Sequence, residues 1–393
     1  MSGISFRAGE ARRTVPQTHD IANMTLALAL GKRGLGQCWP NPSVGAVVAD
    51  PATGRVISCA WTAPGGRPHA EALALAKAGD AARGATLYAT LEPCSHWGKT
   101  PPCADAAIAA GIARLVYGVV DPDVRVQGAG LAKLRGAGVE VAESALTAEA
   151  RWLTLGHELR VTAWRPFVQV KQAVDAGGMV PAGNGAPVWV TGEAARARGH
   201  LMRSEADAIL AGHGTVLADN PDLTCRLPGL AHRSPVRVVL ISDASLPADA
   251  KMLATLDKAP VWAVCAPDAP EENMARLRAA GAECITVERE APGRLSLPGV
   301  LKALADRGIT RLLVEGGPTL AASFVAAGLA DEAVFFQAAA VLSGPGIKPK
   351  AGLAEFAHHE QYKLAGHQCV GGDCMLTYRR AAFWPGDPAA AKR

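Results

Sequence analysis

The feature that most limits the fold is a regular alternation of short apolar segments with helical ones. In the first half of the chain we expect strands at 43–49, 55–61, 85–90, 113–119 and 138–142, with a helix over 20–32 ahead of them. The first two strands should form a hairpin, and helices should separate the others. Strands that alternate with helices form largely parallel sheets with helices on both faces. This half is therefore expected to be an α/β domain.

The same alternation starts again after Arg165-Pro166. Further strands are expected at 167–174, 208–211, 237–242, 261–265, 284–287, 311–315 and 332–337, with helices between several of them. A helix over 147–161 ends just before this second run. A length of 393 residues suits two domains of ordinary size. We expect these domains to span 18–160 and 165–381.

Composition favours small-molecule partners over nucleic acid. The chain has 40 Lys and Arg against 36 Asp and Glu, a net charge of +4, and only 5% aromatic residues. A nucleic-acid-binding protein usually has a clustered basic excess or aromatic side chains that stack on bases. We find no apolar run of roughly 18 residues and no signal peptide, so we expect no membrane segment. Nine dispersed cysteines favour a reducing cytoplasm.

Three metal-binding side chains stand at expected element boundaries. His69 lies where a helix begins, Cys94 follows a strand, and Cys103 opens the next helix. One imidazole and two thiolates leave the fourth position of a tetrahedral zinc site open, which is typical of a catalytic site. Zinc in such a site lowers the pKa of water to near neutrality. Glu71, two residues after His69, is placed to move protons without binding the metal.

The spacing of the cysteines departs from the general zinc-deaminase signature. That signature has two residues between its cysteines, whereas eight separate Cys94 from Cys103. His96 lies between them and could compete for the metal, but its neighbours favour an open loop, so we expect it to face substrate. A zinc deaminase and a chance grouping both remain open from these residues alone.

A second candidate site lies at 311–320. There an apolar strand runs into Glu315-Gly-Gly-Pro-Thr and then into an alanine-rich helix. Glycines and a helix N-terminus favour phosphate binding. The same pattern is equally typical of an ordinary strand–turn–helix connection, which is the simpler interpretation of this segment in isolation.

Longer segments around both candidate sites resemble one protein family. The stretch 90–103, with 40–45, 69–71, 121–122 and 128–130, resembles the deaminase half of the bifunctional riboflavin-biosynthesis deaminase–reductases, in which the wide cysteine spacing is normal. Segments that resemble the reductase half of the same family lie at 203–210, 214–226 and 315–320. The deaminase resemblance covers residues 20–156.

This resemblance implies a fold and a zinc site. The first domain would be a cytidine-deaminase-like three-layer α/β/α structure and the second a dihydrofolate-reductase-like α/β structure. His69, Cys94 and Cys103 would bind zinc, and Glu71 would shuttle the proton. Asn41 would hydrogen-bond the pyrimidine, although Asn41-Pro42 also suits a simple turn.

The resemblance also implies a site for NADPH and a phosphorylated substrate. The implied NADPH contacts are Ala173, Trp189, Thr215, Asp219, Ser242, Gly317, Pro318, Thr319, Leu320, Ala321, Ala322 and Ser323. The implied substrate contacts are Arg203, Leu223, Arg226 and Glu315. Arginine binds phosphate through two parallel hydrogen bonds, so Arg203 and Arg226 suit a substrate phosphate.

Four positions in the second half depart from the family pattern. Asp175 and Pro187 replace serines, while Gly177 and Ile241 replace aspartates. Proline cannot make the hydrogen bond of a hydroxyl, and Asp175 adds negative charge near a phosphorylated ligand. A weakened or inactive reductase is therefore an alternative. An active one is favoured because Asp219, Arg226 and Glu315 are kept.

The expected function is a two-step conversion. A zinc-dependent deamination of a diaminopyrimidinone that carries a ribosylamino 5′-phosphate would precede NADPH-dependent reduction of its ribosyl chain to ribityl. The resemblance also implies a homo-dimer or homo-tetramer. Two further functions stay open: a nucleoside or tRNA deaminase, which would need a basic patch that the chain lacks, and a zinc-stabilised scaffold without activity.

Overall fold

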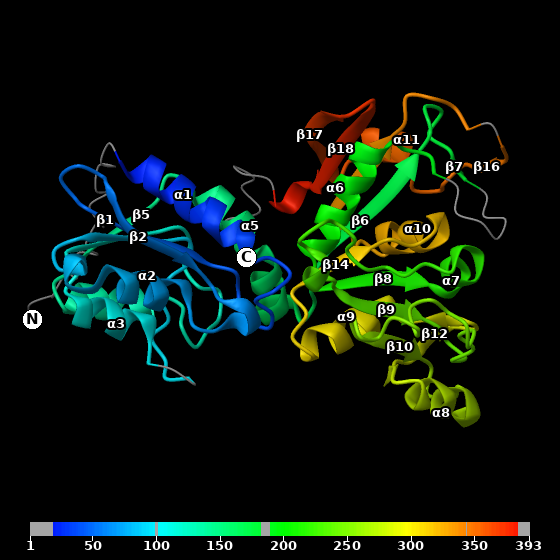
Figure 1. The fold of residues 1–393 in the computed structure, drawn as a ribbon, viewed down its shortest axis with the longest axis horizontal. Coiled ribbons are helices and arrows are strands. Elements are labelled where there is room, and N and C mark those ends of the chain that lie inside the picture. The colour runs from blue at the N-terminus through cyan, green and yellow to red at the C-terminus, as the bar shows by residue number, and fades with distance from the viewer. Residues whose placement is uncertain (1–18, 99–100, 182–188, 343, 384–393) are drawn as a thin grey trace, which may run out of the picture. The chain divides into compact units, whose positions relative to one another are not determined.

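The computed structural model describes residues 19–98, 101–181, 189–342 and 344–383. The chain divides into two compact units, described separately below (Figure 1). The first unit comprises 1–33, 43–63 and 68–154, and the second comprises 34–42, 64–67 and 155–393. The domain limits expected from the sequence, 18–160 and 165–381, stay predictions.

The first unit is built on a five-stranded sheet in the order β2-β1-β3-β4-β5. Its elements are β1 (Gly45–Ala49), β2 (Val56–Trp61), β3 (Thr86–Ala89), β4 (Arg114–Tyr117), β5 (Glu140–Glu143), α1 (Asp20–Arg33), α2 (Ala70–Ala78), α3 (Cys103–Ala110), α4 (Ala129–Gly136) and the start of α5 (Thr147–Ala163). β1 pairs antiparallel with β2 and β3, whereas β3, β4 and β5 are parallel. The expected partly parallel sheet is confirmed.

A buried ion pair ties the start of α1 to this sheet. Arg114 on β4 donates two hydrogen bonds to the Asp20 carboxylate, at 2.7 and 2.9 Å. The Tyr88 hydroxyl on β3 donates a third, at 3.0 Å. Both members of the ion pair are buried, so the charge of each is compensated where water cannot solvate it.

The second unit contains a nine-stranded sheet in the order β11-β10-β9-β8-β14-β6-β15-β18-β17. Its strands are β6 (Phe167–Val174), β8 (Ala208–Gly212), β9 (Val236–Leu240), β10 (Val261–Cys265), β11 (Glu283–Thr286), β14 (Arg311–Val314), β15 (Glu332–Gln337), β17 (Tyr362–Val370) and β18 (Asp373–Arg380). Two small ribbons pair β7 (Val180–Pro181) with β16 (Gly346–Ile347) and β12 (Arg289–Ala291) with β13 (Arg294–Leu295). In the order of the nine-stranded sheet, the first seven strands, β11-β10-β9-β8-β14-β6-β15, are parallel to one another. β18 pairs antiparallel with β15, and β17 pairs antiparallel with β18.

Helices cover both faces of this larger sheet, as the alternation predicts. They are α6 (Glu193–Ser204), α7 (His213–Asp219), α8 (Glu271–Ala279), α9 (Leu297–Asp306), α10 (Pro318–Ala326) and the short α11 (Leu353–Ala357). One apolar core includes residues of α9 and α10, and a separate one includes residues of α6, α7 and α8. The inner parallel strands are accordingly buried on both faces, whereas the edge strand β11 is partly exposed.

The segment 34–42 packs within the second unit although it precedes β1 in the chain. The Trp39 ring meets that of Trp262 edge-on, with centroids 6.5 Å apart. The Leu35 carbonyl accepts a hydrogen bond of 2.6 Å from Arg233. These contacts explain why the segment clusters with the later part of the chain.

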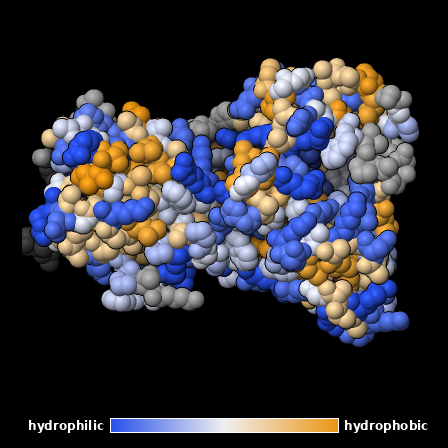
Figure 2. Space-filling view, viewed as in Figure 1, coloured by the Kyte–Doolittle hydropathy of each residue, from blue (hydrophilic) through white to orange (hydrophobic). Residues whose placement is uncertain are grey.

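The surface is of mixed character. The face in Figure 2 interleaves hydrophilic and hydrophobic residues, which is normal because apolar atoms form a large part of any protein surface. Among the helices of the described residues, none is long and apolar enough to cross a bilayer.

Candidate active sites

The three predicted metal ligands come together in the first unit. Nδ1 of His69 lies 3.6 Å from Sγ of Cys94 and 3.3 Å from Sγ of Cys103. His69 is the N-cap of α2, and Cys103 is the first residue of α3. The Cys103 amide, at this helix start, donates to Cys94 Sγ at 3.3 Å, which favours the thiolate that binds metal. One nitrogen and two sulfur donors fit zinc with an open fourth position.

Glu71 faces these ligands from the first turn of α2. It is 3% exposed, and its carboxyl interacts with His69 and with both thiols. Burial raises the pKa of this carboxyl. His96 lies outside the triad on an exposed stretch after Cys94, so it is not part of the donor set.

The loop that carries Cys94 is braced by a carboxylate that the sequence does not single out. Glu92 is 2% exposed, and its two oxygens accept from four backbone amides. Those amides belong to Asp121, Gly128, Gly130 and Leu131, at 2.9–3.3 Å. A carboxylate at the start of α4 also suits the positive end of the helix dipole. Glu92 therefore fixes the loop just ahead of a metal ligand.

We expect Gly130→Ala to displace this loop and lower zinc binding. A Cβ at position 130 would lie 2.0 Å from the Pro93 carbonyl oxygen, a backbone atom that cannot move alone. Overpacking of this kind costs about 1–3 kcal/mol. Zinc content and thermal unfolding of the purified variant measure the effect. Gly136→Ala, in open space on the same helix, is the control and should keep full zinc content; equal zinc in both variants contradicts the prediction.

Asn41 falls in the 34–42 segment that packs with the second unit. Its side-chain amide nitrogen donates to the Gly66 carbonyl at 2.8 Å, and its backbone amide donates to Cys38. Asn41 thus closes a turn over 38–41 and ties it to Gly66, rather than starting a turn at Asn41-Pro42. Binding of the pyrimidine by Asn41 stays a prediction.

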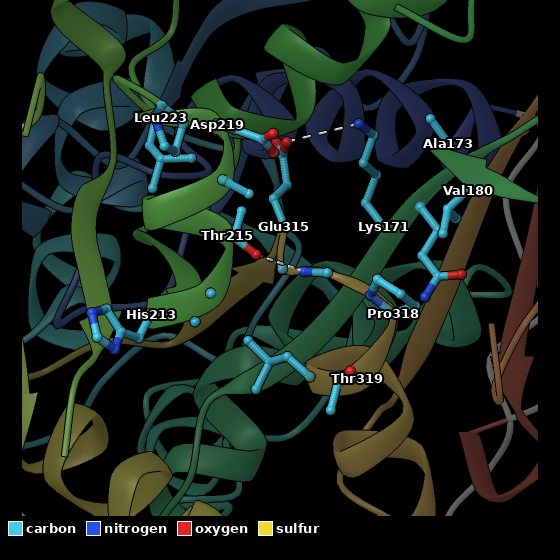
Figure 3. Close-up of a pocket in the computed structure, with 18 of the residues that line it drawn as sticks. Lys171, Ala173, Val180, His213, Thr215, Asp219, Leu223, Glu315, Pro318 and Thr319 are labelled. Atoms are coloured by element: carbon cyan, nitrogen blue, oxygen red, sulfur yellow. Dashed lines mark hydrogen bonds and ion pairs between the residues drawn. The ribbon is translucent and has the colours of Figure 1, made fainter. Parts of the chain in front are cut away.

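A cavity of 1210 Å³ opens in the second unit at the carboxyl ends of its parallel strands (Figure 3). Crevices at this edge of a parallel sheet are where ligands of such folds bind. Of the residues predicted to contact NADPH or substrate in this half, those lining the cavity are Ala173, Trp189, Arg203, Thr215, Asp219, Leu223, Arg226, Ser242, Glu315, Gly317, Pro318, Thr319, Leu320 and Ser323.

A charged cluster sits on the cavity wall. Arg203 at the end of α6 forms two hydrogen bonds with Glu315, at 2.8 and 2.9 Å. Lys171 on β6 lies 3.7 Å from the same carboxylate, as the dashed line in Figure 3 marks. Burial alone would raise the pKa of Glu315, but these two cations outweigh it and lower the pKa to about 2. Glu315 is therefore ionised at neutral pH.

The turn from β14 into α10 forms another part of the wall. Gly317 is the N-cap of α10 and Pro318 its first residue, where proline's missing amide costs nothing. The Gly317 amide donates to the Thr215 hydroxyl at 2.9 Å (Figure 3), which ties this turn to α7. With the Gly317 amide engaged and no amide hydrogen on Pro318, the Thr319 amide and the positive end of the helix dipole are the features here that suit a phosphate group.

Two predicted residues do not line the cavity, and several unpredicted ones do. Ala321 is 1% exposed and packs in the apolar core beside Phe324, and Ala322 packs against the same core. Both residues lie on the side of α10 that faces the apolar core. Lining residues that the prediction omits include Lys171, His213 and Lys251. His213 adjoins the segment 214–226 that carries the resemblance, and Lys171 lies two residues before the predicted Ala173, so both positions are close to a signal in the sequence.

The departures from the family pattern fall largely away from the cavity. The Asp175 carboxylate accepts from the amides of Leu342 and Met179, at 2.9 and 2.8 Å, which holds its pKa below the usual range. Ile241 is fully buried in an apolar core. Neither of them nor Gly177 lines the cavity. Pro187 lies outside the described residues.

Comparison with known proteins matches both halves. The family model "Cytidine and deoxycytidylate deaminase zinc-binding region" matches residues 17–119, and "RibD C-terminal domain" matches 166–376. The riboflavin biosynthesis protein RibD of Aquifex aeolicus is 38% identical over 91% of this chain and 97% of its own length. That of Bacillus amyloliquefaciens is 40% identical over 90% of this chain and 94% of its own. The chain belongs to the RibD family.

Solved RibD structures agree with this assignment. RibD of Acinetobacter baumannii superposes with a TM-score of 0.80 at 31% identity, covering 92% of this chain and 99% of that one. A Thermotoga maritima diaminohydroxyphosphoribosylaminopyrimidine deaminase/5-amino-6-(5-phosphoribosylamino)uracil reductase gives 0.78 at 33% identity, with the same coverage.

This RibD chain is a bifunctional enzyme of riboflavin biosynthesis, a deaminase that is also a reductase. Its cofactors are zinc and NADPH, as the sequence predicts. The predicted α/β class, with a cytidine-deaminase-like first domain and a reductase second domain, is confirmed.

Proposed function

We propose that this RibD chain deaminates the diaminopyrimidinone that carries a ribosylamino 5′-phosphate and then reduces the ribosyl chain of the product to ribityl. The observation that carries the proposal is the presence, in one chain, of a His–Cys–Cys donor set and a large cavity at the edge of a parallel sheet. The Thermotoga relative, whose name specifies both substrates, supports the same assignment.

In the deaminase step, His69, Cys94 and Cys103 would hold zinc, which activates water for attack on the ring carbon that bears the amine. Glu71 takes a proton from that water and returns one to the amine, which leaves as ammonia. Its burial beside the ligands keeps the carboxyl within reach of both partners. We assign substrate contacts to His96, whose exposed position is compatible with an incoming ligand, and to Asn41.

In the reductase step, NADPH supplies the hydride, and the protein positions the two ligands. The turn at Gly317–Thr319 and the side chains of Thr215 and Asp219 are assigned to the dinucleotide. Arg203, Arg226 and Glu315 are assigned to the substrate. Because Arg203 is engaged by Glu315, Arg226 is the better placed of the two arginines to bind a phosphate.

An active reductase is favoured over a deaminase with an inactive second half. The described departures from the family pattern lie outside the cavity, while its charged cluster is intact. A nucleoside or tRNA deaminase and an inactive scaffold are not favoured, because the family match extends over both halves of the chain.

The deciding experiment supplies the purified protein with the diaminopyrimidine phosphate, with and without NADPH. Ammonia release and NADPH oxidation are followed separately. We expect ammonia in both reactions, and NADPH oxidation only after ammonia has been released. Ammonia release without NADPH oxidation would leave only the deaminase half of the proposal. The absence of both ammonia release and NADPH oxidation would overturn the whole proposal.

Removal of zinc is expected to separate the two activities. After dialysis against a chelator, ammonia release should be lost, because the donor triad then has no metal to activate water. NADPH oxidation with the deaminated intermediate should continue, because its cavity residues do not include the triad. Readdition of zinc should restore ammonia release. Persistent ammonia release by metal-free protein would contradict the assignment.

We also propose a cytoplasmic homo-oligomer, a dimer or tetramer. None of the nine cysteines, all of which are among the described residues, forms a disulfide, and this supports a reducing compartment. Light scattering coupled to gel filtration measures the mass directly, and a monomer at micromolar concentration would refute the oligomer.

A further inference from the structure

The loop 220–226 after α7, called here the cavity-wall loop, carries two cavity residues in a conformation that L-amino acids rarely adopt. Leu223 has φ of 60° and Asn220 has φ of 40°. The left-handed region is unfavourable for non-glycine residues and persists only where the surroundings fix it. Leu223 nevertheless lines the cavity, as does Arg226. Something outside the loop must therefore hold this turn.

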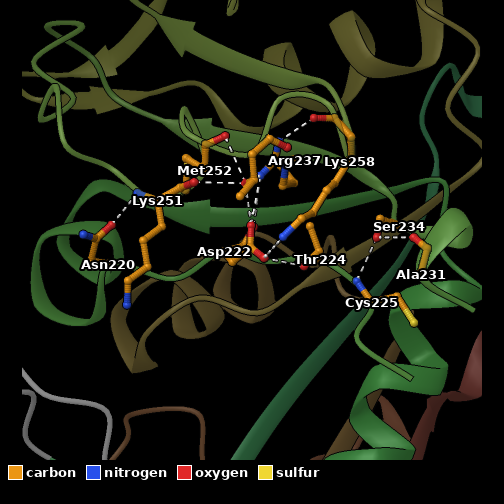
Figure 4. A network of polar contacts seen from close by, with 12 residues as sticks. Asn220, Asp222, Thr224, Cys225, Ala231, Ser234, Arg237, Lys251, Met252 and Lys258 are labelled. Atoms are coloured by element: carbon orange, nitrogen blue, oxygen red, sulfur yellow. Dashed lines mark hydrogen bonds and ion pairs between the residues drawn. The ribbon is translucent and has the colours of Figure 1, made fainter. Parts of the chain in front are cut away.

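Arg237 on β9 holds the loop from behind (Figure 4). It is fully buried, and it does not line the cavity. Nη1 donates to Oδ1 and to the backbone oxygen of Asp222, each at 3.3 Å. The same guanidinium is fixed by Thr255, whose hydroxyl and carbonyl accept at 2.6 and 2.9 Å, and by the Ala259 carbonyl.

Asp222 passes this restraint to its neighbours in the loop. Its carboxylate accepts from the Thr224 hydroxyl at 2.6 Å and from the Thr255 hydroxyl at 2.6 Å. The restrained residues, Asp222 and Thr224, stand on either side of the left-handed Leu223. The ion pair with Arg237 also compensates a charge that burial would otherwise make costly.

The cavity side supplies the opposing restraint. Arg203 donates from Nη1 to the Thr224 carbonyl at 2.9 Å while it binds Glu315. The cavity-wall loop is therefore held between one arginine in the cavity and another behind it. We therefore expect loss of Arg237 to free the turn at Leu223 while the residues that line the cavity are unchanged.

We propose that Arg237, acting through Asp222, is a positioning residue of the reductase, which fixes the left-handed turn at Leu223 and thereby directs Arg226 toward the phosphorylated substrate. This inference rests on the proposed function, because it assigns Arg226 to the substrate. It accounts for a buried charge at a position that touches neither ligand. A merely structural arginine would affect stability alone.

The test measures reductase kinetics of the full-length protein with NADPH and the deaminated pyrimidine phosphate. We expect Arg237→Met to raise the KM for the pyrimidine about tenfold while kcat changes little, the pattern of lost substrate binding. The KM for NADPH and the rate of ammonia release should stay unchanged. Arg237→Lys, which keeps a cation near Asp222, should recover part of the affinity.

Arg165→Met is the matched control. Arg165 forms a similar ion pair with the buried Asp331, at 2.6 and 2.8 Å, and does not line the cavity. It should lower the midpoint of thermal unfolding without changing either KM. The same behaviour in Arg237→Met would overturn the proposal.

Thr224→Val decides the question if Arg237→Met does not fold. It removes a single hydroxyl donor to Asp222 and leaves Arg237 in place. A raised KM for the pyrimidine supports the proposal, and an unchanged KM overturns it. Wild-type turnover is measured first: its absence refutes the proposed function and this inference together, whereas wild-type turnover with unaltered variants refutes the inference alone.

Discussion

Ammonia release should fall by about 10²–10⁴-fold when Glu71 is replaced by glutamine, the usual contribution of a general acid–base residue. Glutamine has nearly the same shape, so the packing at the start of α2 is kept. It cannot accept the proton of water or deliver one to the amine. Zinc content and NADPH-dependent reduction of the deaminated intermediate should match those of the wild type.

Three measurements on one preparation make this test decisive. Ammonia release reports the proton shuttle, metal analysis reports the donor triad, and NADPH oxidation reports the second unit. Glu140→Gln is the control, because Glu140 is a half-exposed carboxylate of the same unit that pairs with Arg114. It should leave ammonia release unchanged. Wild-type ammonia release by Glu71→Gln would refute the assigned role, and loss of zinc would make Glu71 a structural residue.

Glu315→Gln is expected to reduce NADPH oxidation by about 10²-fold or more and to destabilise the second unit by about 3 kcal/mol. The change removes one negative charge from between two cations, Arg203 and Lys171, all three largely buried. Breaking a buried ion pair by removing one partner is strongly destabilising because the remaining charge has no compensation. Arg203 is then free to move away from the cavity-wall loop.

The pH dependence of stability provides a second view of the same carboxylate. The pKa of Glu315 in the folded protein, about 2, lies below its ordinary value of 4.5. Its stabilising contribution is therefore complete at neutral pH and is lost as the pH falls from about 4.5 toward 2. The Glu315→Gln variant should lack this component of acid unfolding.

Glu332→Gln separates stability from catalysis. Glu332 on β15 is a buried carboxylate that pairs with Arg379 at 2.8 Å, and it does not line the cavity. It should destabilise the fold without changing the kinetics of NADPH oxidation. If Glu315→Gln shows the same pattern, Glu315 has no role in the reductase site. Ammonia release should be unaffected in both variants.

The sequence predicts well those features that depend on a short-range pattern of residues, namely the positions of the strands and the identity of the metal donors. Most inner parallel strands of both sheets are largely apolar runs, so their positions follow directly from hydrophobicity, whereas the edge strands β5 and β11 carry polar residues at their ends. β17 escapes such a prediction because it is a largely exposed edge strand without an apolar run. The metal donors can be identified because residue type and order alone specify the chemistry.

Long-range contacts determine the features of the two sites that the sequence does not predict. Glu92 reaches residues 29–39 positions away, and nothing in its own neighbourhood indicates four amide partners. Arg237 likewise looks like an ordinary strand residue until Asp222 and Thr255 surround it. The placement of most reductase residues in one cavity follows from the family resemblance, whereas composition and spacing provide only the weak phosphate signal at Gly316-Gly317.

The interleaving of the two units has a consequence for protein engineering. Residues 34–42 and 64–67 are encoded with the deaminase half but fold with the reductase half. A gene cut near codon 160 would separate Trp39 from Trp262 and Leu35 from Arg233, and so would give two incomplete fragments. Chimaeras with other family members face the same difficulty. A hybrid should take both short segments from the parent that supplies its reductase, even though both are encoded within the deaminase half of the gene.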